Sequence, residues 1–262
     1  MVIDIHTHIF ADALAARAVH RLEEKGDIKA FLPGTKAGLV ESMDRAGISV
    51  SVIQPVVTKP SQTETINRWA AEIRDQRILP FAGLHPDDQD YKEHLRQIKE
   101  MGFPGVKLHP DYQGFFVDEP RMFPIYEEIF KNGLILLFHA GLDIGFTPPY
   151  HGTPERIAKV LDAVPGGTVI AAHLGGHAMW DQVERHLAGR NLYLDTSMGI
   201  EYYGGSRLVK IARMHGTDKI LFGTDSPWTS QPDELERMRS LPFTPAELNG
   251  ILYQNAKKLL RL

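Results

Sequence analysis

Histidines and acidic residues stand at the ends of apolar segments in this chain, a pattern that can bind a metal ion. The first such segment is Val2–His8, a β-branched run in which His6 and His8 are two residues apart. Alternate residues of a strand share a face, so both imidazoles point the same way where the strand ends, and Asp4 lies one step deeper. Converging imidazoles can ligate one metal ion. Two unrelated histidines in a buried strand are the alternative interpretation.

Similar strand ends recur further along the chain. His139 closes the apolar run LILLF, and His173 follows TVIAA. An unpaired imidazole is unfavourable in such a buried segment unless it is hydrogen-bonded or ligated, so we expect a metal or catalytic role for both. Asp225 follows ILFGT, where the sequence Thr-Asp-Ser-Pro is by itself typical of a turn or cap. Asp195 is open between a pocket acid and a helix cap.

Lys107 lies between Val106 and Leu108 in an apolar segment and therefore faces the opposite side from both. A lysine that points into a packed interior needs an anionic partner or must lose its charge. Three interpretations remain open. The lysine is carboxylated and bridges two metal ions, or it binds an anionic group of a substrate, or it pairs with an acid on a neighbouring strand such as Asp4.

The other histidines carry less information. His85 and His109 both precede proline and either shape turns or support the site from behind; we place His109 on the substrate side, together with Trp228. We expect the helical histidines to be surface or packing residues, and His151 and His177 are unassigned. The helical histidines are His20, His94, His186 and His215.

Apolar strands alternate with amphipathic helices over the whole chain, without a break in composition. The predicted strands are Val2–His8, Ile48–Pro55, Ile78–Leu84, Gly102–Leu108, Leu134–Phe138, Thr168–Ala172, Asn191–Leu194 and Lys219–Gly223. The predicted helices are Ala11–Lys25, Thr35–Ala46, Ser61–Asp75, Asp87–Met101, Glu119–Lys131, Thr153–Ala163, His177–Leu187, Ser206–His215, Asp233–Ser240 and Thr244–Leu260.

Strict alternation of β and α segments implies a parallel sheet, and eight such units in 262 residues fit one α/β domain, a (β/α)8 TIM barrel over residues 1–262. The competing architecture is an open doubly wound sheet, but no Gly-rich phosphate loop follows the first strand. In a barrel, the downstream strand ends all lie on one face. The scattered polar residues are therefore expected to meet in one pocket.

Composition excludes several classes of function. The formal charge of −4 and the lack of a Lys/Arg block argue against a nucleic-acid partner. The chain has no cysteine, so any metal must use His, Asp, Glu or a modified Lys. We find no signal peptide and no apolar run of the ~20 residues that span a membrane. The absence of disulfides suits a cytoplasmic protein.

Five motifs together resemble the amidohydrolase superfamily, in the branch called amidohydrolase family 2. They are IDIHTH, GVKLHP, LLFHAG, AHLGG and LFGTDSPW, and the ending NAKKLLRL is similar to the closing helix of that family. The resemblance implies a metal-dependent barrel in which His6, His8 and His139 ligate the metal. It also implies that His173 ligates a second metal or acts beside the first.

The same resemblance implies that Asp225 is a ligand, a general base, or both. It places Lys107 on the strand whose lysine is carboxylated in some members, so that one or two ions are open. Zinc is the first expectation for the metal, and manganese or iron also accept these ligands.

Such a site suits hydrolysis, because a divalent ion lowers the pKa of a bound water to ~7 and Asp225 can accept its proton. We therefore expect a hydrolase of a small-molecule amide, ester or lactone. The alternative within the same branch is a metal-dependent decarboxylase of an aromatic or unsaturated acid. A non-catalytic binding protein on a decayed barrel is the third hypothesis, and it predicts missing ligands.

The loops after the strands set specificity in such a barrel, and here three of them are long and aromatic. They span Asp111–Val117, Gly141–Gly152 and Ser197–Gly205. Their aromatic residues either line a pocket for a flat or apolar ligand or pack the loops. A homodimer is the usual expectation for a soluble homo-oligomer.

Overall fold

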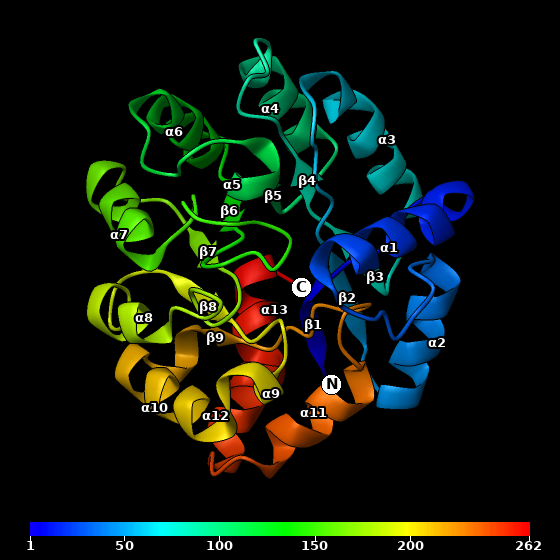
Figure 1. The fold of residues 1–262 in the computed structure, drawn as a ribbon, viewed down its shortest axis with the longest axis vertical. Helices are drawn as coiled ribbons and strands as arrows, with labels where there is room; N and C mark the ends of the chain where they lie inside the picture. Colours follow the sequence, from blue (N-terminus) through cyan, green and yellow to red (C-terminus); the bar gives the residue numbers. More distant parts are fainter.

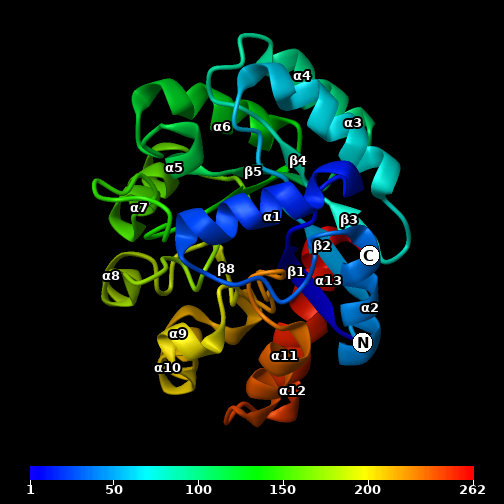
Figure 2. The same cartoon turned by 45° about the vertical axis from the view of Figure 1, so that its right-hand side comes forward.

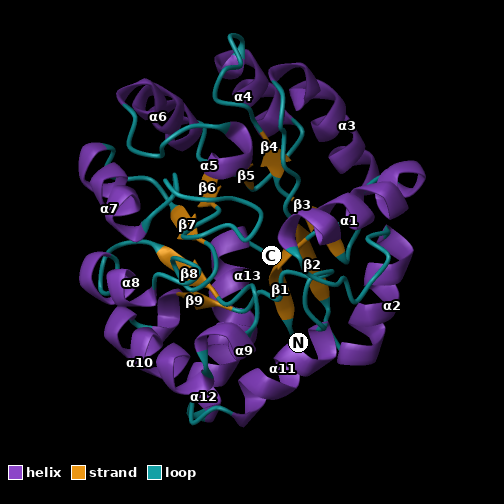
Figure 3. Cartoon of the chain, viewed as in Figure 1, coloured by secondary structure: helices purple, strands orange, loops and turns teal.

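Short parallel strands form a closed ring at the centre of the computed structural model, which describes residues 1–262. The strands are β1 (Ile3–Thr7), β2 (Val50–Ile53), β3 (Ile78–Pro80), β4 (Ala82–Gly83), β5 (Gly105–Leu108), β6 (Ile135–Phe138), β7 (Val169–Ala171), β8 (Tyr193–Asp195) and β9 (Ile220–Leu221). They follow one another around the ring in chain order, each parallel to the next. Figure 3 shows the strands inside a ring of helices.

The ring is closed at the two places where the ladder of strand pairs is interrupted. Between β3 and β4, the N–H of Phe81 donates to the carbonyl of Ile53 at 2.9 Å, so the segment that pairs with β2 runs on directly into β4, which pairs with β5. Between β9 and β1, the N–H of Ile5 donates to the carbonyl of Phe222 at 2.8 Å. The predicted (β/α)8 barrel is therefore confirmed as a single domain.

Helices follow the strands and cover the ring from outside, as Figure 1 shows. The α-helices are α1 (Asp12–Gly26), α2 (Lys36–Ala46), α3 (Thr63–Ile73), α4 (Tyr91–Glu100), α5 (Pro110–Gln113), α6 (Phe123–Lys131), α7 (Pro154–Ala163), α8 (Trp180–His186), α9 (Ile200–Tyr203), α10 (Gly205–His215), α11 (Gln231–Ser240), α12 (Pro245–Asn249) and α13 (Asn255–Leu260). Short helical turns are η1 (Pro60–Gln62), η2 (Pro120–Met122), η3 (Thr217–Lys219) and η4 (Gly250–Gln254).

Two apolar clusters hold these layers together. The larger one, with 48 buried residues, lies between the strands and the outer helices. The smaller one fills the barrel with side chains such as Ile5, Val52 and Leu137, and it includes Ala256 and Leu260 of α13. Helix α13 appears in the middle of the ring in Figure 1. The closing helix of the chain therefore packs against the interior of the barrel.

Local sequence explains where several helices begin and end. The side chains of Thr35 and Thr153 accept hydrogen bonds from the N–H groups of Gly38 and Arg156, and so cap α2 and α7 as predicted. Gly47 ends α2 with a φ of 71°, a conformation that glycine adopts without strain. These local signals set the ends of α2 and α7 and do not depend on the residues at the carboxyl ends of the strands.

The structure corrects several predicted boundaries. The third strand breaks at Phe81 because Pro80 has no N–H for the ladder. Two expected loops contain short helices, α5 and α9. Asp87 and Asp88 do not cap α4, which begins at Tyr91, and α8 begins at Trp180 rather than at His177. The last predicted helix is divided into α12, the π-helical η4 and α13.

Helix α1 has an unusual place. Figure 2 shows it crossing in front of the strands, whereas α2 lies in the outer ring. The helix that follows β1 in sequence is therefore an addition over the face of the barrel where the strands end. Its position makes it a wall of the space above those ends.

Candidate metal centre and active site

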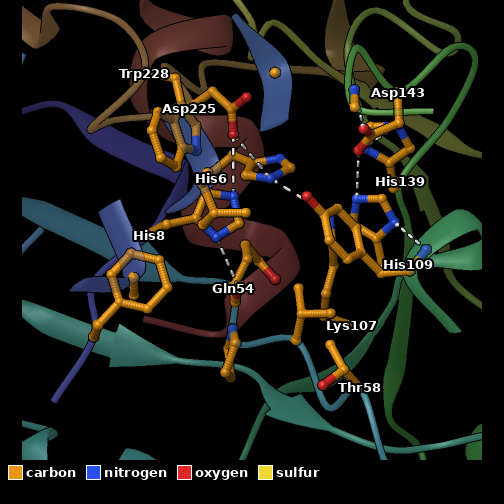
Figure 4. Close-up of a pocket in the computed structure, with 18 of the residues that line it drawn as sticks. His6, His8, Gln54, Thr58, Lys107, His109, His139, Asp143, Asp225 and Trp228 are labelled. Carbon is orange, nitrogen blue, oxygen red and sulfur yellow. Dashed lines mark hydrogen bonds and ion pairs between the residues drawn. The ribbon is translucent and has the colours of Figure 1, made fainter. Parts of the chain in front are cut away.

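One cavity of about 590 Å³ opens at the carboxyl ends of the strands. The predicted site residues that line it are His6, His8, Lys107, His109, His139, His173, Asp225 and Trp228. The fold thus brings into one cavity residues that are up to 222 positions apart in the chain. Figure 4 shows His6, His8 and Asp225 on one side of this space and His109, His139 and Asp143 on the other.

The first group of metal-capable atoms consists of His6, His8 and Asp225, all within 4.8 Å of one another. Oδ1 of Asp225 lies 3.1 Å from Nε2 of His8 and 3.4 Å from Nε2 of His6. Asp225 is held in place by its N–H, which donates to the carbonyl of His6 at 2.8 Å. Its φ of 71° is rare for a residue other than glycine and turns the carboxylate back toward β1.

Hydrogen bonds behind the two imidazoles decide where their protons lie. Nδ1 of His6 is 2.9 Å from Oδ2 of Asp195. Burial raises the pKa of Asp195, but His6, Ser197 and Lys107 together lower it by more, so this carboxyl is ionised and only accepts. Nδ1 of His8 lies 2.9 Å from the carbonyl of Gln54, which also only accepts. Both imidazoles therefore carry hydrogen on Nδ1 and turn Nε2 toward Asp225.

A second chain of hydrogen bonds starts from the same aspartate. The hydroxyl of Ser197 donates to Oδ1 of Asp195, so its oxygen accepts from Nδ1 of His173 at 2.8 Å. Nε2 of His173 must then accept from Nδ1 of His139, at 3.0 Å. This leaves Nε2 of His139 without a hydrogen, and the atom is buried with no hydrogen-bond partner. Asp195 thus orients His6 directly and His139 through two intermediates.

These imidazoles are neutral, which is the state that binds metal. Burial and the charge of Lys107 lower the pKa of His6, and burial together with a neighbouring imidazole holds the pKa values of His139 and His173 well below the ordinary value. Lone pairs of His6, His8 and Asp225 then converge on one point and repel each other unless a positive charge lies between them. A divalent cation fits this place because it satisfies all three atoms.

The second group consists of His109, His139 and Asp143. Nε2 of His109 is 3.1 Å from Oδ2 of Asp143, and Nε2 of His139 is 3.9 Å from the same oxygen. The two rings stack with their centroids 4.1 Å apart. His139 therefore faces Asp143 here, and the structure does not place it in one group with His6, His8 and Asp225. The N–H of Tyr112 donates to Nδ1 of His109, so Nε2 of His109 carries a hydrogen toward Asp143 and this group has fewer free donor atoms for a metal.

Lys107 is buried and lines the cavity, with Nζ 3.4 Å from Nε2 of His6. Burial lowers its pKa to about 8, although Asp195 and Asp225 oppose this shift. The ion pair with Asp4 that we considered from the sequence is wrong. Asp4 instead accepts hydrogen bonds from Thr224 at 2.6 Å and from Gln231 at 2.8 Å.

The remaining histidines divide into those that line the cavity and those that lie outside it. None of the four helical histidines lines the cavity, and His215 bonds the carbonyl of Leu192 at 2.9 Å as a packing residue. His85 and His151 also lie outside the lining. His177, which the sequence left unassigned, lines the cavity, and its buried Nδ1 has no partner.

Sequence reasoning missed three contributors to the site, Gln54, Asp143 and Ser197. Gln54 acts through its backbone carbonyl, which no residue type announces. Asp143 lies in a long loop and meets His109 only through the path of that loop. Ser197 directly follows the strand end at Asp195–Thr196, so its position two residues after an acid was the one usable signal.

The geometry of this site agrees with the protein family that the sequence matches. The model of the amidohydrolase family matches residues 3–262, so the chain belongs to that family. The resemblance drawn from the five motifs is confirmed over essentially the whole chain.

Three similar proteins indicate which branch of the family the chain resembles. The chain is 23% identical over 168 residues to the 2-amino-3-carboxymuconate-6-semialdehyde decarboxylase of Dictyostelium discoideum, and the match spans 52% of this chain and 47% of that protein. The crystal structure of 2,6-dihydroxybenzoate decarboxylase from Rhizobium is similar with a TM-score of 0.76 and 19% identity, covering 99% of this chain and 98% of the other. A manganese-bound dihydroxybenzoic acid decarboxylase from Polaromonas has a TM-score of 0.74 and 17% identity, covering 100% and 97%.

These relatives overturn the expectation of a hydrolase. All three are decarboxylases by name, so the alternative that we drew from the sequence has the better support. The Polaromonas structure holds manganese, and the donor groups of this chain are suited to a divalent metal ion, without being specific for zinc. None of the helices combines the length and the hydropathy that a membrane span needs.

Proposed function

We propose that this protein is a metal-dependent decarboxylase of an aromatic or unsaturated carboxylic acid. The observation that carries the proposal is the convergence of Nε2 of His6, Nε2 of His8 and Oδ1 of Asp225, with every other polar atom of the two imidazoles already satisfied. The names of the similar proteins support decarboxylation rather than hydrolysis.

The metal would be held by His6, His8 and Asp225, and the unpartnered Nε2 of His139 is the next donor available to it. Bound there, a divalent ion would hold oxygens of the substrate and stabilise the negative charge that develops on carbon. Zinc and manganese both accept such nitrogen and carboxylate ligands. We favour a single ion, because Nε2 of His109 in the second group carries a hydrogen that it donates to Asp143, whereas Nε2 of His8 is free of hydrogen.

The chain's own residues would supply the rest. Lys107 offers a buried positive charge that attracts the carboxylate of the substrate, and this role needs no carboxylation of the lysine. The C–C bond breaks with its electrons left on carbon, carbon dioxide leaves, and a proton takes its place. Asp225 relays this proton rather than storing it: burial raises its pKa, but His6, His8 and Lys107 together lower it by more.

Two further assignments follow from the hydrogen bonds. His173 acts through His139 and not on the substrate, because both of its ring nitrogens are engaged. His109 and Trp228 line the cavity beside the metal residues and are positioned to contact the substrate. The substrate is a small molecule, since the cavity has a volume of about 590 Å³ between the strand ends and helix α1.

The test uses purified protein loaded with Mn²⁺ or Zn²⁺ and a panel of hydroxybenzoates and unsaturated acids. We expect release of carbon dioxide from at least one class, loss of that release after chelation, and recovery when metal is returned. Metal content is measured by mass spectrometry in parallel. A fully metal-loaded protein that releases no carbon dioxide from any of these acids would contradict the proposal.

A further inference from the structure

The cavity is much larger than the cluster of metal-capable residues needs. A cavity of about 150 Å³ holds a benzene ring, whereas this one has about 590 Å³. The polar residues at the strand ends surround only part of it. The remaining space extends under helix α1, and its lining has a different chemistry.

The walls away from the strand ends are apolar. Helix α1 contributes Leu14, Ala18 and Leu22, which recur every four residues and so lie on one face of the helix. Helix α3 contributes Ile66 and Trp69 from the other side. Neither helix places a titratable side chain in the lining, and every charged or imidazole group comes from strand ends and their loops. We call the space lined by Leu14, Ala18, Leu22, Ile66 and Trp69 the apolar arm of the cavity.

Contacts at the end of α1 hold this wall over the barrel. Nζ of Lys25 lies 3.5 Å from the ring centroid of Phe146 and 4.0 Å from that of Tyr112. A side chain at Gly26 would have its Cβ within 3.0 Å of Ile144, so the helix and the loop approach closely there. Helix α1 is therefore fixed to the loop that also lines the cavity, and its apolar face is a built wall of that cavity.

We propose that the apolar arm binds an uncharged hydrocarbon tail of the substrate, whose carboxylate lies among the metal-capable residues. This proposal rests on the proposed function and narrows it to acids that carry an alkyl or aryl extension. A charged tail is disfavoured, because nothing in the arm compensates a buried charge. Ala18 is the residue that sets the width of the arm, since it is the smallest of the five.

The probes are straight-chain 2-alkenoates of four to twelve carbons, and binding to the metal-loaded protein is followed by calorimetry. Burial of each added methylene should tighten binding about two- to fourfold until the arm is filled. Affinity that does not change with chain length would overturn the proposal.

Two variants on the same helix sharpen the test. Ala18→Phe fills the arm and should weaken the ten-carbon acid at least tenfold while leaving the four-carbon acid within twofold. Ala16 is exposed on the opposite side of α1, so Ala16→Phe is the matched control and should change neither. Equal loss in both variants, or equal loss for both acids, would contradict the assignment.

These experiments test the apolar arm and the proposed decarboxylation independently of each other. The dependence on chain length reports the arm, whereas carbon dioxide release reports the chemistry. Tight binding of long acids without release of carbon dioxide from any acid would refute the proposed function while the arm stands. Release of carbon dioxide from short acids without any gain from a tail would refute the arm alone.

Discussion

The two ends of the cavity are built on opposite principles. At the strand ends, His6 and His139 are each fixed by hydrogen bonds that lead back to Asp195. In the apolar arm, contacts such as those of Leu22 and Trp69 have no direction and depend only on shape. The metal-capable side chains are therefore held in fixed orientations. Single apolar substitutions in the arm can change which substrate binds without moving these donor atoms.

The largest effect should come from Asp225→Asn. This change removes the charge that binds the cation and relays the proton, so turnover at saturating metal should fall about 100- to 10,000-fold. Thermal unfolding should remain cooperative, because asparagine has nearly the same shape and keeps the N–H that donates to the carbonyl of His6. Activity within a few-fold of the native protein would show that the rigid end of the cavity does not carry the chemistry.

Asp195→Asn should weaken metal binding about 10- to 100-fold, as loss of an outer partner usually does. The amide keeps only one acceptor oxygen, so it cannot accept from both Nδ1 of His6 and the hydroxyl of Ser197. Metal affinity is measured by competition with a chelator. Asp218→Asn, at an exposed position, is the control and should bind metal normally.

Ser197→Ala should have a smaller effect, about tenfold or less on metal affinity. It removes the acceptor for Nδ1 of His173, and so loosens His139, but leaves the bond between Asp195 and His6 intact. Ser206→Ala at an exposed site is the matched control. A loss as large as that of Asp195→Asn would mean that the two branches from Asp195 are not separable.

The smallest effect belongs to the apolar arm. Trp69→Ala should weaken a ten-carbon 2-alkenoate by about threefold through lost apolar contact, with metal affinity unchanged. Trp69→Phe should lose less, because it keeps an aromatic wall. Altered metal binding in either variant, measured with the same chelator, would show that the two ends of the cavity are coupled.

The barrel was predictable because it rests on local signals. Apolar runs such as Leu134–Phe138, the cap at Thr153 and the stop at Gly47 each act within a few residues. Once eight such units are recognised, the geometry of a parallel barrel places their ends on one face. Boundaries failed where a backbone property decided them, as at Pro80, or where a loop formed a short helix such as α5.

The sequence by itself determined the fold and the gathering of His6, His8, His139 and Asp225 at one mouth, because residue type and strand periodicity suffice for these. The family followed from the resemblance of five motifs and not from periodicity. Only the tertiary structure decided the direction of each imidazole proton, the pairing of His109 with Asp143 and the position of α1 over the cavity. Those features depend on contacts between residues far apart in the chain. Their geometry is fixed by packing and by the path of the loops, and neither is encoded in a local pattern.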